Sequence, residues 1–200
     1  MDPGESENPK IRTMEDDLKN ALDVLRKGGV VLYPTDTIWG LGCDATNEEA
    51  VARVYAIKRR SDSKSMLVLM ENVNLLERYV NEVPDIAYEL IEVTDKPMTI
   101  IYPGAKNLAG NLIAADGTIG IRITREAFTC RLIQRFRKPV VSTSANFSGD
   151  PSPDTFAAVS AEIKASADYV VRYRRDELTP ASPSSIIRLG VGGQIEILRK

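Results

Sequence analysis

Residues 13–33 read TMEDDLKNALDVLRKGGVVLY, and this stretch decides the class of the fold. Its apolar residues follow the i, i+3, i+4, i+7 spacing of an amphipathic helix, which Thr13 is expected to cap: Leu18, Ala21, Leu22 and Leu25. The two glycines at 28–29 end that helix, and residues 30–33 form a short apolar run typical of a buried strand. A helix that leads into a buried strand predicts an α/β fold.

The rest of the chain continues this alternation without an internal repeat or a long linker. We expect residues 1–12 to be a flexible leader and residues 13–200 to form one domain. Further helices are expected over about 47–58, 84–94, 126–136 and 154–165, and further strands over 66–70, 98–102, 118–123, 140–141, 169–172, 184–189 and 194–198. Residues 34–45 are expected to form a loop, and the glycine-rich segment 190–193 predicts a hairpin with some antiparallel pairing.

Composition excludes several classes of protein. The chain has 200 residues, with 26 basic and 28 acidic side chains and a net charge of −2, so it is not a bulk binder of polyanions. It contains no histidine, which excludes Ser-His-Asp and Cys-His nucleophile systems and Cys/His zinc sites. Cys43 and Cys130 form no C-x-x-C pair and are expected to be reduced thiols. No apolar run approaches the roughly 20 residues of a membrane helix, so we expect a cytoplasmic protein without membrane contact.

Charge is nevertheless uneven along the sequence. Residues 53–64 carry five basic residues against one acidic residue, residues 122–138 carry six against one, and residues 71–95 carry seven acidic residues against one basic residue. The two basic segments would form an anion site if they met in space. On charge alone, solvated helix faces are the favoured alternative.

Two polar segments stand where elements of the predicted fold join. Lys58, Arg60 and Lys64 are spaced K-x-R-x-x-x-K on the turn between a helix and a strand, and such a turn can curl around a polyphosphate. Residues 142–149, STSANFSG, follow an apolar strand directly, which is where α/β sheets place ligand contacts. Taken separately, each segment fits an ordinary polar turn at least as well.

A third segment, residues 33–42, reads YPTDTIWGLG and contains the only tryptophan of the chain. By itself it fits a loop with a buried aromatic anchor. Together the three segments resemble the YrdC-like family of L-threonylcarbamoyladenylate synthases, and the resemblance extends from about residue 25 to the C-terminus. It implies a single YrdC-like domain in which a twisted mixed sheet and helices surround a basic concave cleft.

The resemblance also implies an activity. Members make L-threonylcarbamoyladenylate from L-threonine, bicarbonate and ATP, with Mg²⁺ accompanying the ATP, and release pyrophosphate. A transferase complex then modifies tRNA adenosine 37, and the family is described as binding double-stranded RNA. The chemistry needs positioning and charge neutralisation more than a protein base, which suits a chain without histidine.

Site residues follow from the same resemblance, position by position. Residues expected to bind L-threonine are Thr35, Thr37, Arg122, Ser142 and Ser184, with Arg122 holding its carboxylate. Residues expected to bind ATP are Arg60, Lys64, Thr118, Ser144, Ser152 and Arg199. The expected catalytic group consists of Lys58, Arg60, Lys64, Ser144 and Asn146.

The sequence departs from the family pattern at several positions. Leu69 stands where some members have a histidine, and Arg188 stands where many have an aspartate. Residues 65–66 and 97–99 are also weaker matches. These departures keep two alternatives open: a YciO-type paralogue with a different or weak substrate activity, and a tRNA- or double-stranded-RNA-binding module without catalysis.

Overall fold

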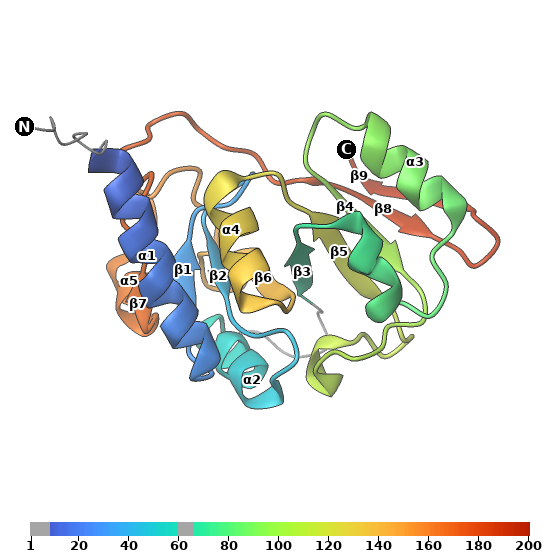
Figure 1. The fold of residues 1–200 in the computed structure, drawn as a ribbon, viewed down its shortest axis with the longest axis horizontal. Coiled ribbons are helices and arrows are strands. Elements are labelled where there is room, and N and C mark those ends of the chain that lie inside the picture. Colours follow the sequence, from blue (N-terminus) through green and yellow to red (C-terminus); the bar gives the residue numbers. More distant parts are fainter. Residues whose placement is uncertain (1–8, 60–65) are drawn as a thin grey trace, which may run out of the picture.

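The computed structural model describes residues 9–59 and 66–200, with residues 9–12 described by their backbone alone. The described strands form one mixed sheet in the order β7-β1-β2-β6-β3-β5-β4-β8-β9, with helices packed around it (Figure 1). The strands are β1 Val31–Tyr33, β2 Gly40–Gly42, β3 Leu67–Met70, β4 Met98–Tyr102, β5 Ile119–Ile123, β6 Val140–Ser144, β7 Tyr169–Val170, β8 Ser185–Leu189 and β9 Ile195–Arg199. The helices are α1 Pro9–Arg26, α2 Glu48–Ile57, α3 Asp85–Val93, α4 Ala127–Phe136 and α5 Ala161–Ser166, with 3₁₀ turns η1 Val73–Arg78 and η2 Gly110–Leu112. The predicted α/β class and mixed sheet are confirmed.

Helix α1 begins earlier than its sequence pattern predicts. It begins at Pro9, so Thr13 lies inside the helix and the prediction that Thr13 caps it is wrong. Proline suits a first helical position because its missing N–H would have no helical partner there. The C-terminal end is as predicted: Gly28 has φ +74°, and Gly29 N donates to Val24 O at 2.9 Å.

Local capping explains where three other helices begin. Asn47 accepts from Ala50 N at the start of α2, and the Glu126 side chain accepts from Thr129 N at the start of α4. The predicted start of the helix over 154–165 is wrong, because α5 begins only at Ala161 and is capped by Ser160. The helix predicted over 126–136 is confirmed as α4, and it buries one apolar stripe of four side chains: Phe128, Leu132, Ile133 and Phe136.

Strand β2 lies inside the segment that the sequence predicts to be a loop. It runs antiparallel to both β1 and β6, between them. A side chain at Gly42 would place its Cβ 2.2 Å from Val141 O, so only glycine allows the strands to approach this closely. Glycine is also depleted in strands, and this explains why the pattern conceals β2.

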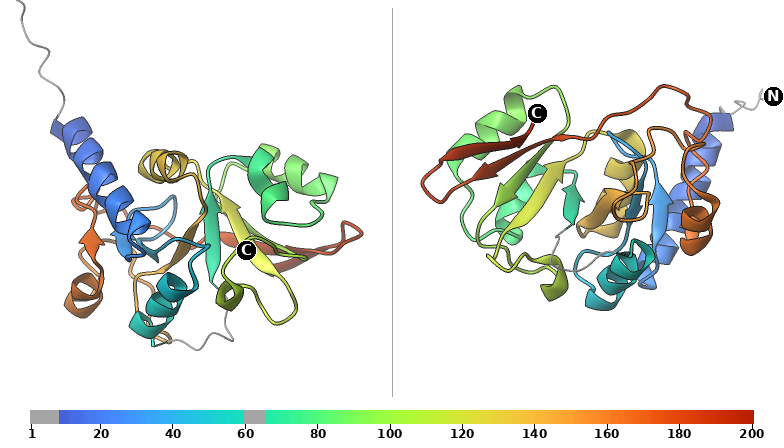
Figure 2. Two further views of the ribbon diagram at one scale, coloured as in Figure 1. Left: turned by 60° about the horizontal axis from the view of Figure 1, so that its bottom comes forward. Right: turned by 180° about the vertical axis from the view of Figure 1, so that it is seen from behind.

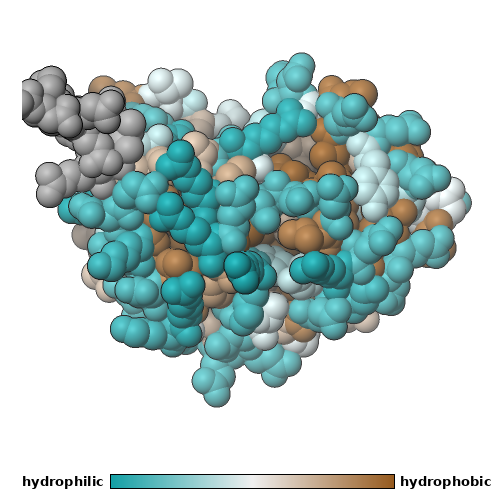
Figure 3. All heavy atoms as spheres, in the orientation of Figure 1, coloured by the Kyte–Doolittle hydropathy of each residue, from teal (hydrophilic) through white to brown (hydrophobic). Residues whose placement is uncertain are grey.

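The core lies between the sheet and the helices on one of its faces. Helix α4 packs on α1 and β3, and Val68, Leu69 and Met70 of β3 are buried. The view from behind in Figure 2 shows no helix crossing in front of β4, β5 and β8, so the opposite face of this half of the sheet is open. The helix-covered side in Figure 3 is largely hydrophilic, as solvated helix surfaces should be.

None of the described helices is long and apolar enough to cross a membrane. Cys43 and Cys130 are both free thiols, as predicted. Burial raises the pKa of Cys130 to about 11, so its thiol is protonated at neutral pH.

Candidate active site

A cavity of about 610 Å³ lies on the open face of the sheet. The strand register explains its composition, because residues paired directly across neighbouring strands point to the same face. Gly40 of β2 is opposite Ser144 of β6. Ser142, two residues earlier in β6 and therefore on the same face, is opposite Leu67 of β3, which in turn lies beside Gly120 of β5. A second row brings Arg122 of β5 opposite Thr99 of β4, which is opposite Ile186 of β8. Strands that are distant in sequence thus present polar side chains to one cavity, interspersed with apolar residues such as Leu67 and Ile186.

Eight of the predicted site residues line this cavity: Thr37, Thr118, Arg122, Ser142, Ser144, Ser152, Ser184 and Arg199. Three more lie behind or beside it, namely Thr35, Lys58 and Asn146. Arg60 and Lys64 lie outside the described residues, so their predicted contacts with ATP phosphates stay predictions. The expected basic concavity is present, since Arg122, Arg188 and Arg199 line it against a single described carboxylate, Asp116.

Arg122 is the most buried charged group of the cavity. It is only 3% exposed, and its Nη2 lies 3.0 Å from Asp36 Oδ1 and donates to Thr37 Oγ1 at 3.2 Å. Its Nε is buried and has no hydrogen-bond partner among the described residues. A buried guanidinium with an unused donor suits a carboxylate ligand.

The turn at residues 35–38 that carries Thr37 is held by its own hydroxyl groups. Thr35 Oγ1 donates to Ile38 O at 2.8 Å, and Thr37 N donates to Thr35 Oγ1 at 3.0 Å. Arg174 Nη1 donates to Thr35 O from behind, at 3.1 Å. Thr35 therefore shapes the turn, and Thr37 is the residue that reaches the cavity.

Lys58 joins the basic turn to the serine-rich loop. Its side chain is 1% exposed, and Nζ donates to Ser144 O and, at 2.7 Å, to Asn146 O. Ser148 N in turn donates to Lys58 O at 2.8 Å. These contacts make Lys58 a positioning residue for the loop; its predicted contact with phosphate stays a prediction.

Two hydroxyl clusters complete the lining. Thr118 donates through N and Oγ1 to Asp116 Oδ1, and these bonds hold the pKa of the Asp116 carboxyl below its usual range. Ser184 Oγ and Thr99 Oγ1 share a hydrogen bond of 2.8 Å, while Arg199 Nε donates to Ser184 O at 2.9 Å. Burial and the nearby charge of Arg122 lower the pKa of Arg199.

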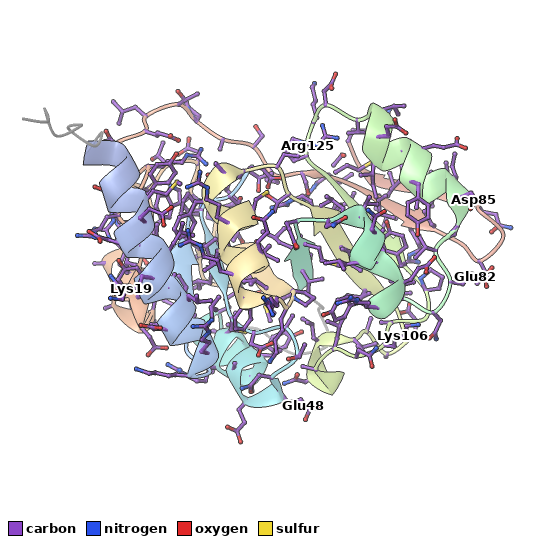
Figure 4. All side chains as sticks on the ribbon, viewed as in Figure 1. Lys19, Glu48, Glu82, Asp85, Lys106 and Arg125 are labelled. Carbon is purple, nitrogen blue, oxygen red and sulfur yellow. The ribbon has the colours of Figure 1, made fainter. Side chains whose placement is uncertain are left out.

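Ion pairs neutralise most of the described basic residues in the two basic segments. Arg53 pairs with Asp168, Arg59 with Glu162, Arg131 and Arg135 both with Glu15, and Lys138 with Asp44. The favoured alternative of solvated helix faces thus holds for these side chains. Figure 4 shows Arg125 on the outside of the molecule, and Glu82 and Asp85 of the acidic segment also point outward.

Sequence reasoning missed four residues near the cavity: Asp36, Thr99, Asp116 and Arg188. Asp36 stands between two predicted residues, Thr35 and Thr37, whereas Thr99 has no predicted site residue beside it in the sequence. The contacts of both join segments that are distant in the sequence. Asp116 stands two residues before Thr118, and this short spacing is the one local signal that could have identified it. Arg188, a departure from the family pattern, lines the cavity, whereas Leu69 is fully buried.

Comparison with known proteins places this cavity in a family. The family model Sua5_yciO_yrdC, described as "Telomere recombination", matches residues 23–200. Threonylcarbamoyl-AMP synthase of Pseudoalteromonas translucida is 36% identical over 154 residues, which cover 76% of this chain and 82% of that protein.

Two solved structures share the fold. Sua5 of P. abyssi in complex with L-threonine has a TM-score of 0.78 at 23% identity, over 92% of this chain and 52% of that chain. YciO of E. coli has a TM-score of 0.79 at 22% identity, over 97% of this chain and 91% of that chain. The chain belongs to the Sua5/YciO/YrdC family.

Proposed function

We propose that this protein is an L-threonylcarbamoyladenylate synthase, which forms its product from L-threonine, bicarbonate and ATP and releases pyrophosphate. The observation that carries the proposal is the convergence of Arg122, Ser142 and Ser144 on one cavity floor. The relationship to curated threonylcarbamoyl-AMP synthases and the likeness to a threonine-bound structure support the same activity.

The residues divide between two ends of the cavity. Arg122, Thr37, Ser142 and Ser184 would hold the amino acid, with the carboxylate on the guanidinium of Arg122. Thr118, Ser144, Ser152 and Arg199 would hold the nucleotide, and Arg60 and Lys64 its phosphates. A cavity of about 610 Å³ is within the range of small-molecule sites.

The reaction proposed here has two steps. The threonine amine adds to the carbon of carbon dioxide and releases a proton to solvent, or it adds to bicarbonate, whose C–O bond breaks so that water leaves; either route forms a carbamate. A carbamate oxygen then attacks the α-phosphorus of ATP, and the bond to pyrophosphate breaks. Hydroxyls and cations that fix the reactants and neutralise developing charge are sufficient for such a displacement.

Magnesium would accompany the ATP. Among the described residues no cluster of three potential metal ligands occurs, and Asp116 is the single carboxylate lining the cavity. This donor set fits an ion carried mainly by the phosphates of ATP. When bound, Mg²⁺ neutralises part of the triphosphate charge.

The product would pass to a transferase complex that modifies tRNA adenosine 37, and the protein would act in the cytoplasm. The ion pairs of the basic side chains argue against a wide RNA-binding surface. Any contact with tRNA or double-stranded RNA would be local and strongly dependent on salt.

Pyrophosphate release from ATP and Mg²⁺ tests the proposal. The assay is run with a panel of amino acids, each with and without bicarbonate. We expect pyrophosphate release only when L-threonine and bicarbonate are both present. ATP binding without release on threonine, or a preference for another amino acid, would favour a YciO-type paralogue, for which Arg188 in the cavity is the motivating feature. RNA binding without ATP affinity would favour a non-catalytic module.

A further inference from the structure

Thr99 lies in the cavity at a position that the sequence motifs do not mark. It is 2% exposed, lines the cavity from β4, and shares a hydrogen bond of 2.8 Å with Ser184 Oγ. The register of β4 and β5 pairs Ile100 with Ile121 and Ile101 with Gly120, so Thr99 is opposite Arg122. Side chains directly opposite each other on one face have Cβ atoms about 4.5–5.5 Å apart. Thr99 therefore lies between Arg122 and Ser184.

The hydrogen bonds of this pair leave one donor unused. Thr99 and Ser184 hold two hydroxyl hydrogens, and their shared bond uses one of them. Each hydroxyl has the other as its partner among the described residues, and both are buried at the cavity wall. The second hydrogen thus has no acceptor in the described part of the chain, which is costly for a buried polar group unless a ligand or water accepts it.

A second unused donor lies on the opposite strand. Arg122 Nε is buried without a hydrogen-bond partner, while its Nη2 is held by Asp36 and Thr37. Two unused donors on cross-strand neighbours call for one ligand with several acceptor sites and negative charge, and a carboxylate is the small group that fits.

We propose that Thr99 is an amino-acid-binding residue, whose hydroxyl, coupled to that of Ser184, donates a hydrogen bond to the substrate carboxylate held by Arg122. This inference deepens the proposed function and rests on it. It divides carboxylate recognition between two kinds of donor. Arg122 on β5 supplies the positive charge, while Thr99 on β4 and Ser184, directly before β8, supply neutral hydroxyl donors. The main chain supports the arrangement, because Ser185 N donates to Pro97 O at 3.1 Å beside the hydroxyl pair.

The methyl group of Thr99 packs closely against the neighbouring strand. A Cβ at Gly120 would lie 3.3 Å from Thr99 Cγ2, so the methyl group of Thr99 packs against the bare backbone of β5. The threonine methyl thus fixes the rotamer that turns Oγ1 toward Ser184. Serine at this position would keep the hydroxyl and lose this packing, whereas valine would keep the shape and lose the hydroxyl.

The test measures pyrophosphate release by Thr99→Val at saturating ATP and bicarbonate while L-threonine is varied. A hydrogen bond to a charged group is lost, so the KM for threonine should rise about 10- to 100-fold. The KM for ATP at saturating threonine should stay within about twofold. Thr99→Ser should recover most of the threonine affinity, because it restores the donor. Ile100→Val, a conservative change on the opposite face of β4, should leave both KM values at the parent level.

Three outcomes would overturn the assignment: an unchanged threonine KM in Thr99→Val, equal increases in both KM values, or a Thr99→Ser variant no better than Thr99→Val. If Thr99→Val does not fold, Ser184→Ala probes the same hydroxyl pair from the β8 side and should raise the threonine KM alone. A parent protein that releases no pyrophosphate with threonine would instead refute the proposed function, so the two failures are distinguishable.

Discussion

Replacement of Lys58 by methionine should destabilise the protein strongly without touching the hydrophobic core. Lys58 is 1% exposed, and its ammonium donates to the carbonyls of Ser144 and Asn146. Each hydrogen bond to a charged group contributes about 1.5–3 kcal/mol, so two contribute about 3–6 kcal/mol. Methionine fills the space and removes the cost of burying a charge, which leaves a net loss of about 3 kcal/mol. For a domain of this size that loss lowers Tm by about 6–12 °C.

Arg59→Met is the matched control for this experiment. Arg59 is the next residue, but its side chain is 64% exposed, and its ion pair with Glu162 lies at the surface. The Arg59 guanidinium also lies 4.0 Å from the centroid of the Phe147 ring. A surface ion pair contributes about 0–1 kcal/mol and an exposed cation–π contact about 0.5–1 kcal/mol. The sum of about 0.5–2 kcal/mol is smaller than the loss expected for Lys58→Met and should lower Tm by about 1–8 °C. Thermal unfolding followed by circular dichroism gives both values. The positioning role of Lys58 would be refuted if Lys58→Met melted within about 2 °C of the parent. It would also be refuted if Arg59→Met lost as much stability as Lys58→Met.

Three further predictions concern the two ends of the site and the pH dependence of stability. Arg60→Ala and Lys64→Ala should each weaken ATP binding by one to two orders of magnitude, about 1.5–3 kcal/mol, in a calorimetric titration; parent-like affinity in both would remove them from the phosphate site. Arg122→Ala should raise the threonine KM and spare ATP affinity, and an unchanged threonine dependence of pyrophosphate release would contradict its role. The hydrogen bond from Arg53 lowers the pKa of the Asp168 carboxyl in the folded protein. The Asp168 carboxylate therefore contributes stability above its unfolded pKa of about 3.9, and this contribution is lost as pH falls through the lower folded pKa. In urea unfolding, Asp168→Asn should therefore have a lower free energy of unfolding than the parent at pH 7 and the same free energy in strong acid. The same difference in free energy at both pH values would contradict this assignment.

Local signals account for most of the elements. Periodicity predicts α4 and its buried face, apolar runs predict β3 and β6, and the glycine-rich turn predicts the β8–β9 hairpin. Each of these depends on residues close together in sequence. The errors at residues 40–42 and at residue 154 have different causes. Glycines usually mark loops, and at Gly40–Gly42 the pairing with β1 and β6 overrides that composition. At Asp154 the error is local, because Ser160 caps a helix that begins only at Ala161.

Buried contacts between distant residues had no local signal. Asp17 lies on the amphipathic helix α1 and is fully buried, and it accepts from Arg172 N, Tyr173 N and the hydroxyl of Tyr169. Nothing in the spacing of α1 indicates that a carboxylate there anchors a segment about 150 residues away. The same holds for Asp36, whose partner Arg122 lies on another strand.

The amino-acid sequence by itself determined the order of the helices and of every strand except β2, the absence of histidine chemistry, and the motifs whose combination resembles one enzyme family. Through that resemblance it also identified eight of the residues that line the cavity. Only the tertiary structure decided that β3 lies between β5 and β6, and that Thr99 is opposite Arg122. Strand order and register are set by how whole elements pack over the core, and a residue's neighbours across a sheet leave no trace in the residues beside it.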